Sequence, residues 1–246
     1  MLKMHQVIVE PEGLTGSKGF SLIEMAVVML ILGLLLSGLF VALGDSSSNR
    51  RRSDANAQIE SIIEALYGFA QSNGRLPCPA TVASTGAEAF VSVGNCSASD
   101  GFVPAVTLSI QGPTDANNLL VDPWGNPYRY SVFGNLYTNV ANIKTQFSGT
   151  VTSGLCVARA VSCGAPILTT TAPALVYSMG ADYAFSSSAL QNENADAPIN
   201  NYRMADDTHF VLADYAEEGA NAFDDIVVWI SPNTLFSRMI SAGQLP

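Results

Sequence analysis

The stretch KGFSLIEMAVVMLILGLLLSGLF, from Lys18 to Phe40, decides how the rest of this sequence is interpreted. After Glu24 the chain has no charged residue for nineteen positions, from Met25 to Leu43. About 20 apolar residues are enough for a helix to cross the hydrocarbon core of a bilayer. The sequence therefore predicts a membrane-spanning helix with a carboxylate at its start.

This segment does not fit a secretory signal peptide that is removed after its apolar core. The apolar run is too long, and Leu39 to Leu43 offers no small-residue cleavage site. A carboxylate within a spanning helix costs roughly 2.5–3.5 kcal/mol on insertion scales, and such residues are candidates for function. Glu24 is therefore a candidate functional residue, and simple anchoring does not explain it.

The pattern Gly19-Phe20-Ser21-Leu22-Ile23-Glu24, followed by the apolar run, resembles the processing site of type IV prepilins and type II secretion pseudopilins. The resemblance implies that prepilin peptidase cuts between Gly19 and Phe20 and that Phe20 becomes N-methylphenylalanine. It implies a leader over residues 1–19. It also implies that Glu24 directs assembly, by pairing with the Phe20 amine of a neighbouring subunit, because a buried charge is tolerable when it is paired.

A second helix-forming stretch follows at residues 54–72, DANAQIESIIEALYGFAQS. Its apolar residues recur at helical spacing, and Asn73-Gly74 with the later Pro77 is a stop signal. We expect either the outer half of one long helix or a separate amphipathic helix after a linker at 44–53. The apolar face comprises Ile59, Ile62, Ile63, Leu66, Phe69 and Ala70.

Helical periodicity largely stops at Arg75, and short apolar runs separated by turn residues follow. The strand candidates are NPYRYSVFG, QFSGTVTSGLCVARA, ALVYSMG, THFVLADY and DDIVVWIS, and NTLFSRMISAGQLP predicts a short helix capped by Asn233 or Thr234. We predict an α+β fold, with a long N-terminal hydrophobic helix packed on an antiparallel β-sheet, as in type IV pilins. Its expected parts are a leader (1–19), a transmembrane or filament-core segment (20–44), an amphipathic second half of the helix (45–74) and a periplasmic globular body (75–246).

All four cysteines follow the apolar segment, and their even number favours two disulfides in an oxidising compartment. Proximity favours Cys78–Cys96 and Cys156–Cys163, one of three possible connectivities, and free buried cysteines are the alternative. A zinc site is poorly supported, because no CxxC pair occurs and His209 is the only histidine after residue 5.

The chain carries a net charge of −10, which argues against nucleic acid as a partner. Ten carboxylates lie between Asp182 and Asp225, with Arg203 as the only base. This acidic region is either a solvated loop or a site for a hard cation such as Ca²⁺, which prefers several oxygen ligands.

Three short segments resemble parts of the major pseudopilin of type II secretion. They are VDPWGNPYRY (Val121–Tyr130), YSMGAD (Tyr177–Asp182) and DDIVVWIS (Asp224–Ser231). The C-terminal loop of those pseudopilins binds Ca²⁺, and the matching aspartates are Asp182 and Asp225. The family loop is short and rich in glycine, whereas 42 residues separate these two aspartates here.

The resemblance also implies a location and partners. It implies a single-pass protein of the bacterial inner membrane, with a cytoplasmic N-terminus and a periplasmic body, which later enters a filament or pseudopilus and can reach the cell surface. The cysteines support this orientation, whereas the basic residues Arg50 to Arg52 oppose it under the positive-inside rule. The implied partners are prepilin peptidase, other pilin or pseudopilin subunits, the inner-membrane assembly machinery and, before assembly, membrane lipid.

The sequence therefore predicts a structural subunit rather than an enzyme. A body larger than that of a minimal major pseudopilin favours a minor pilin or a specialised pseudopilin. No GxSxG motif or other nucleophile signature accompanies His209, so a membrane-anchored hydrolase is poorly supported. The remaining alternative is a membrane-anchored envelope binding or adhesion module that never enters a filament.

Overall fold

The computed structural model of the chain describes residues 21–149, 151, 153–182, 188–195, 208–216, 219 and 221–246, without the side chains of 36–46. The chain divides into two compact units, Met1–Ser48 and Asn49–Pro246. The second unit, called the body below, holds the sheets and both disulfides. The predicted leader over residues 1–19 lies outside the described residues.

Helix α1 runs from Leu22 to Asn73 and has 52 residues. The alternative of a separate helix after a linker at 44–53 is therefore wrong. The helix ends where the sequence predicted, because Gly74 adopts a φ of 68° and donates its N–H to the carbonyl of Ala70 at 2.9 Å. Glycine tolerates this left-handed conformation, which other residues rarely adopt.

Within the described residues, no helix combines the length and the apolar character that crossing a membrane requires. The predicted spanning helix over residues 20–44 is therefore not confirmed. Part of that range, namely Phe20 and the side chains of 36–44, lies outside what the structure describes.

From Asn49 onward, one side of α1 packs into the core of the body. The buried positions recur every three or four residues, as one face of a helix requires. This amphipathic face was predicted, although Ile63 and Phe69 lie at its margin and are only partly buried. The fully buried members are Ala55, Ile59, Ile62, Leu66 and Ala70.

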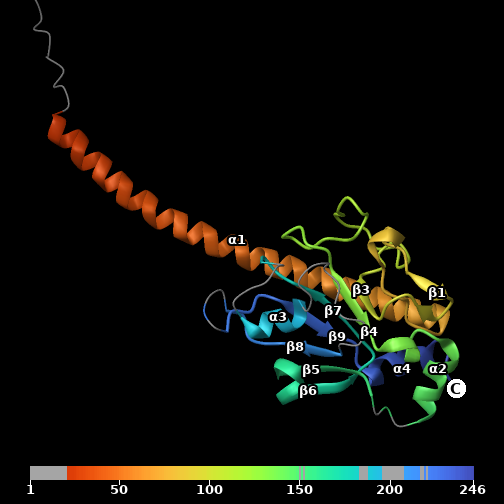
Figure 1. Cartoon of the computed structure of the whole chain (residues 1–246). Coiled ribbons are helices and arrows are strands. Elements are labelled where there is room, and N and C mark those ends of the chain that lie inside the picture. The colour runs from red at the N-terminus through yellow and green to blue at the C-terminus, as the bar shows by residue number, and fades with distance from the viewer. Residues whose placement is uncertain are drawn as a thin grey trace, which may run out of the picture. The chain divides into compact units, whose positions relative to one another are not determined.

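The main sheet of the body has four antiparallel strands in the order β3-β4-β7-β9 (Figure 1). Tyr130 and Val176 on one face join the core cluster that contains the buried side of α1. Leu175 and Tyr177 on the other face join a second cluster. The strands are β3 (Asp100–Phe102), β4 (Arg129–Val132), β7 (Ala174–Ser178) and β9 (Ile226–Trp229).

A second sheet of three strands, in the order β6-β5-β8, supplies the other side of that second cluster. Its strands are β5 (Leu155–Ala160), β6 (Gly164–Ala172) and β8 (His209–Val211). Strands β5 and β6 are antiparallel, but β5 and β8 are parallel. The predicted antiparallel sheet is thus confirmed for the main sheet, and the parallel β5–β8 pair is an exception.

A short hairpin and several short helices complete the body. The hairpin consists of β1 (Phe90–Ser92) and β2 (Asn95–Cys96). The helices are α2 (Val140–Ser148), α3 (Ala189–Ala195), α4 (Pro232–Ser241), η1 (Val82–Ser84), η2 (Gly134–Leu136) and η3 (Val161–Cys163).

Two local predictions about these elements were wrong. The run that begins QFS, at Gln146, was expected to be a strand, but its first three residues end α2, whose first turn is capped by the Asn139 side chain. The C-terminal helix was expected to be capped by Asn233 or Thr234, but its N-cap is Ser231. Proline is favoured in the first turn of a helix, because its missing N–H has no intrahelical partner there, so Pro232 sets the earlier start.

Candidate functional site

The N-terminal motif lies at the start of α1. Gly19 and Phe20, the predicted cleavage and methylation residues, lie outside the described residues. Glu24 lies in the first turn of the helix, exposed, and accepts a hydrogen bond from the backbone N–H of Ser21 at 3.4 Å. A negative charge is favourable there, because the N-terminal end of a helix dipole is positive.

The side chains that surround Glu24 are apolar and exposed. Every described side chain from Ser21 to Leu35 is exposed, and Leu22 and Leu34 are 92% and 69% exposed. Apolar patches larger than a few hundred Å² are rare on soluble monomers and mark surfaces that bind protein or lipid. This part of α1 therefore has the character of an interaction surface with one acidic group at its end.

A second candidate site lies where the acidic C-terminal loop meets α3. The side-chain amide of Gln191 donates to a carboxylate oxygen of Asp182 at 2.5 Å and also to a carboxylate oxygen of Asp224. The other oxygen of Asp224 accepts the backbone N–H of Ala181 at 2.5 Å. Two carboxylates thus converge on one amide group.

The third carboxylate of this region, Asp225, is only 2% exposed. Its Oδ2 accepts the side-chain amide of Asn194 at 2.8 Å, while its buried Oδ1 has no hydrogen-bond partner within the described residues. Burial raises the pKa of Asp225 well above its usual value, and the charges of Asp224 and Asp182 add to this. Asp225 is therefore a buried acid with spare acceptor capacity.

The same causes act on Asp182, the other aspartate that the sequence predicted. Partial burial of its carboxyl group, and then the negative charge of Asp224, raise the pKa of Asp182 to about 6. Carboxylates that repel one another in this way attract cations, because a cation would relieve the repulsion.

The acidic site fits a metal ion only in part. Within the described residues, no group of three or more His, Cys, Asp or Glu side chains is placed to hold a metal ion. The sequence predicted Asp182 and Asp225 as the pair of ligands. In the structure, the carboxylate that shares a hydrogen-bonding amide with Asp182 belongs to Asp224 and not to Asp225. Oxygen is nevertheless the ligand type that Ca²⁺ prefers.

Sequence reasoning missed the two amides that organise this site. Gln191 and Asn194 are three residues apart on α3, so they lie on one face of the helix and reach neighbouring carboxylates. No motif marked them. The doublet Asp224-Asp225, just before β9, was visible in the sequence, but which of its two members approaches Asp182 could not be inferred.

Helix α1 contacts this site through Arg52. A guanidinium nitrogen of Arg52 donates to the backbone carbonyl of Asp224 at 2.8 Å. Its guanidinium carbon lies 4.0 Å from the centroid of the Tyr215 ring, a cation–π contact. The backbone of the acidic loop is thus attached to α1 within the body.

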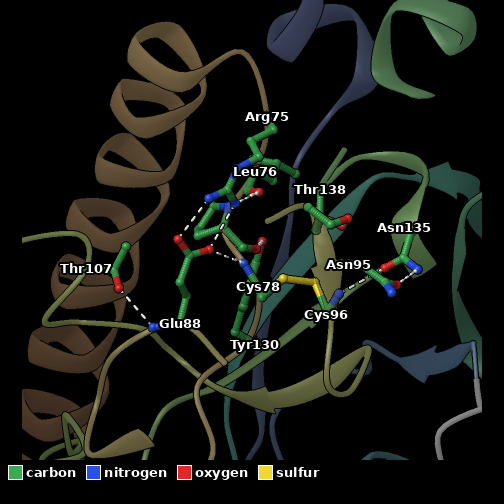
Figure 2. Close-up of a disulfide and its surroundings, with 12 residues drawn as sticks. Arg75, Leu76, Cys78, Glu88, Asn95, Cys96, Thr107, Tyr130, Asn135 and Thr138 are labelled. Carbon is green, nitrogen blue, oxygen red and sulfur yellow. Dashed lines mark hydrogen bonds and ion pairs between the residues drawn. A yellow bond between two sulfur atoms is a disulfide. The ribbon is translucent and has the colours of Figure 1, made fainter. Parts of the chain in front are cut away.

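The disulfides are the two pairs that were expected. Cys78 pairs with Cys96 with Cα atoms 5.3 Å apart, and Cys156 pairs with Cys163 with Cα atoms 6.0 Å apart. Figure 2 shows that the first bond connects the segment after α1 with β2. Since no cysteine is free, His209, which pairs with Cys156 across the β5–β8 ladder, has no thiol nucleophile beside it.

The N-terminal segment also matches a known family. Residues 14–40 match the family model of the prokaryotic N-terminal methylation motif. No curated protein and no solved structure matches the chain. The matched motif indicates a pilin-like protein that is processed by prepilin peptidase.

Proposed function

We propose that this chain is a minor pilin or pseudopilin, cut between Gly19 and Phe20, methylated on Phe20, and assembled into a type IV pilus or a type II secretion pseudopilus. The match of residues 14–40 to the methylation motif carries the proposal. The elaborate body, with a four-stranded sheet, a three-stranded sheet, a hairpin and two disulfides, favours a specialised subunit over an abundant one.

The position of Glu24 suggests how assembly selects its register. In an apolar filament interior, an unpaired carboxylate or ammonium group is costly, whereas a paired one is tolerable. Glu24 lies in the first turn of α1, only four residues from the amine that cleavage would create on Phe20. An incoming subunit is then held at the height where its Glu24 meets the Phe20 amine of a neighbour.

The proposed location follows from the same scheme. The precursor resides in the bacterial inner membrane with its body in the periplasm, where both disulfides can form. It meets membrane lipid, prepilin peptidase and the inner-membrane assembly machinery there, and later other pilin or pseudopilin subunits in the filament.

The test is a comparison of the full chain and Glu24→Ala in cells that possess an assembly system. We expect the variant to be cut after Gly19 and methylated, as read by mass spectrometry of the N-terminus, but to be missing from sheared filaments. Glu60→Ala, which removes an exposed glutamate from the body part of α1, is the matched control and should enter filaments normally. Wild-type incorporation of Glu24→Ala would exclude the assembly role, and an uncut Gly19–Phe20 bond would exclude the processing.

The alternative, an envelope binding module that is anchored but never polymerised, predicts a different fractionation. In that case the mature chain stays in the inner membrane while filaments form without it. Recovery of the chain in sheared filaments decides for the subunit.

We also propose that Asp182 and Asp225 contribute oxygen ligands to a Ca²⁺ site in this acidic region. The spare Oδ1 of buried Asp225 and the convergence of Asp182 and Asp224 on Gln191 support this proposal. Calcium would supply the positive charge that these carboxylates lack, and the bound state would be the more stable one.

Thermal unfolding of the full chain in detergent, with Ca²⁺ or with chelator, tests the cation site. Saturation at 100 times the dissociation constant should stabilise the folded state by about 2.7 kcal/mol. Asp225→Asn should abolish this gain, yet raise stability in chelator, because it removes a buried charge and keeps an acceptor for Asn194. Asp214→Asn, at a side chain that is 92% exposed, should leave the calcium gain intact. Superimposable curves for the wild type would exclude the site.

A further inference from the structure

Helix α1 carries three consecutive arginines, Arg50 to Arg52, shortly after the uncharged apolar run that ends at Leu43. The six residues between, GDSSSN, are small or polar and include one acid, Asp45. The body holds 17 acidic and nine basic residues, and these arginines are three of the nine. An acidic body thus concentrates a third of its positive charge at one place, close in sequence to the apolar run.

The three arginines differ in their surroundings. Arg52 is half-buried and contacts the body through the Asp224 carbonyl and the Tyr215 ring. Arg50 and Arg51 are exposed, and within the described residues their side chains form no ion pair or hydrogen bond. An α-helix turns about 100° per residue, so Arg50 lies about 200° around α1 from Arg52, with Arg51 between them. Arg50 and Arg51 therefore project away from the contact that Arg52 makes.

The direction of these two side chains favours contact with a membrane surface. Side chains on a helix lean toward its N-terminus, which for α1 is the side of the apolar run. Arg50 follows Leu43 by seven residues, or about 10 Å of helix, and the headgroup layer of a bilayer is about 5–7 Å thick. Long basic side chains near the end of an apolar helical segment extend to the headgroups and cover such a difference.

We propose that Arg50 and Arg51 bind the headgroups of anionic phospholipids at the surface of the membrane in which the subunit resides before assembly. This inference rests on the proposed membrane location and adds to it a defined lipid site. A guanidinium group donates two parallel hydrogen bonds to a phosphate, which makes arginine well suited to a phospholipid headgroup. The net negative charge of the lipid supplies the counter-charge that no described residue supplies.

The charge of the body explains why arginines are needed at this place. A body with an excess of acidic residues is repelled by an anionic membrane surface. Basic residues beside an apolar segment are attracted to the same surface. Arg50 and Arg51 therefore hold the base of the body at the headgroups, where the acidic residues alone would be repelled. This role also accounts for basic residues that oppose the expected orientation under the positive-inside rule.

Lipid titration of the full chain in a neutral detergent tests the site, with adducts counted by native mass spectrometry. Dihexanoyl phosphatidylglycerol is anionic, whereas dihexanoyl phosphatidylcholine has the same phosphate without net charge. We expect the anionic lipid to bind at least about tenfold more tightly, because each basic residue near a lipid surface contributes about a factor of five. Equal affinities would overturn the proposal. Displacement by inorganic phosphate at the same concentration would also overturn it, because the ligand would then be a free anion.

Paired substitutions locate the site. Arg50→Gln/Arg51→Gln should bind the two lipids equally, whereas Arg50→Lys/Arg51→Lys keeps both charges and should keep most of the preference. Lys144→Gln/Arg159→Gln, which removes the same charge from exposed positions elsewhere on the body, is the matched control and should bind like the wild type. A loss in this control as large as that in Arg50→Gln/Arg51→Gln would overturn the proposal, because overall charge would then explain the binding.

Two further results separate this inference from the proposed function. Unchanged lipid binding by Arg50→Gln/Arg51→Gln, together with its loss from sheared filaments, would assign the arginines to a neighbouring subunit and overturn the inference. Recovery of the chain in the soluble fraction of cells would overturn the proposed location and the inference together. A membrane-embedded chain without lipid preference would overturn the inference alone. Intact disulfides on non-reducing gels verify that each variant is folded.

Discussion

Arg75 and Glu88 form a bidentate ion pair whose nitrogen–oxygen distances are 2.9 and 2.8 Å (Figure 2). Arg75 follows the end of α1 and Glu88 precedes β1, so the pair fastens the hairpin to the helix end beside the Cys78–Cys96 bond. Glu88 also accepts the backbone N–H of Cys78 at 3.1 Å. Burial acts against ionisation of Glu88, but these hydrogen bonds outweigh it and hold the pKa below its usual value.

Glu88→Gln should therefore be strongly destabilising. Removing one member of a buried pair leaves the other charge uncompensated, which we expect to cost about 3 kcal/mol in the free energy of unfolding. The Arg238–Glu64 pair has the same bidentate geometry, but its side chains are 39% and 60% exposed. Glu64→Gln should accordingly cost less than about 1 kcal/mol. Chemical denaturation of both variants makes the comparison, and equal losses would contradict it.

The Cys78–Cys96 disulfide should contribute more stability than the Cys156–Cys163 disulfide. Its cysteines are 18 residues apart in sequence, against 7 for the second pair. Loop entropy predicts about 3 kcal/mol for the first bond and about 0.5–1 kcal/mol less for the second. Double serine replacements at each pair, compared by thermal unfolding, check the order. A larger loss at Cys156–Cys163 would show that loop entropy does not govern these bonds.

Stability in the presence of chelator should rise as the pH falls from about 7 to about 5.5. The pKa of Asp182 in the folded state is raised to about 6 from an ordinary value of 3.8, so between these values the folded state binds the extra proton. The stabilisation is complete below the unfolded pKa and is lost as pH rises through about 6. Buried Asp225 acts in the same direction.

Asp182→Asn is the control for this pH dependence. In this variant the free energy of unfolding should change less between pH 5.5 and 7 than in the wild type. The loss of stability below about pH 4.5, where Glu88 becomes protonated, should be unchanged. Denaturation midpoints across this range give the measurement. An unchanged slope in Asp182→Asn would assign the pH dependence to another group.

Asn194→Ala should destabilise the body by about 2–4 kcal/mol. The truncation leaves the N–H and carbonyl of Val211 and an oxygen of Asp225 without their amide partner in a buried place. Asn56→Ala, which removes an exposed amide from α1, should change stability by less than about 1 kcal/mol. Similar losses in the two variants, read by denaturant unfolding, would mean that the hydrogen bonds between Asn194 and Val211 of β8 add little stability.

The sequence predicted the features that depend on local patterns. The apolar face of α1 and its stop at Gly74 follow from helical spacing and from the backbone freedom of glycine. Strands β4, β7 and β9 follow from short apolar runs between turns. The two disulfides followed from proximity along the chain, a guide that succeeds when each bond closes a short local loop.

The features that were missed depend on tertiary structure. Nothing in the order of residues shows that β8 runs parallel to β5, because 48 residues lie between these two strands. The role of Asn194 is equally hidden, since a helical asparagine is usually solvated. The resemblance pointed to Asp225, whereas Asp224 is the aspartate that shares the Gln191 amide with Asp182, and only the tertiary structure shows this.

The exposed start of α1 has one last consequence, which concerns the number of neighbours it requires. Its described side chains are exposed around the whole circumference from Ser21 to Leu35, and not along a single stripe. A helix that is apolar all round needs apolar surroundings on every side. A single protein neighbour covers only part of that circumference, so we expect pairwise association through this segment to be weak. In the proposed filament several helices together complete the enclosure, and we expect its growth to be cooperative with a nucleation threshold.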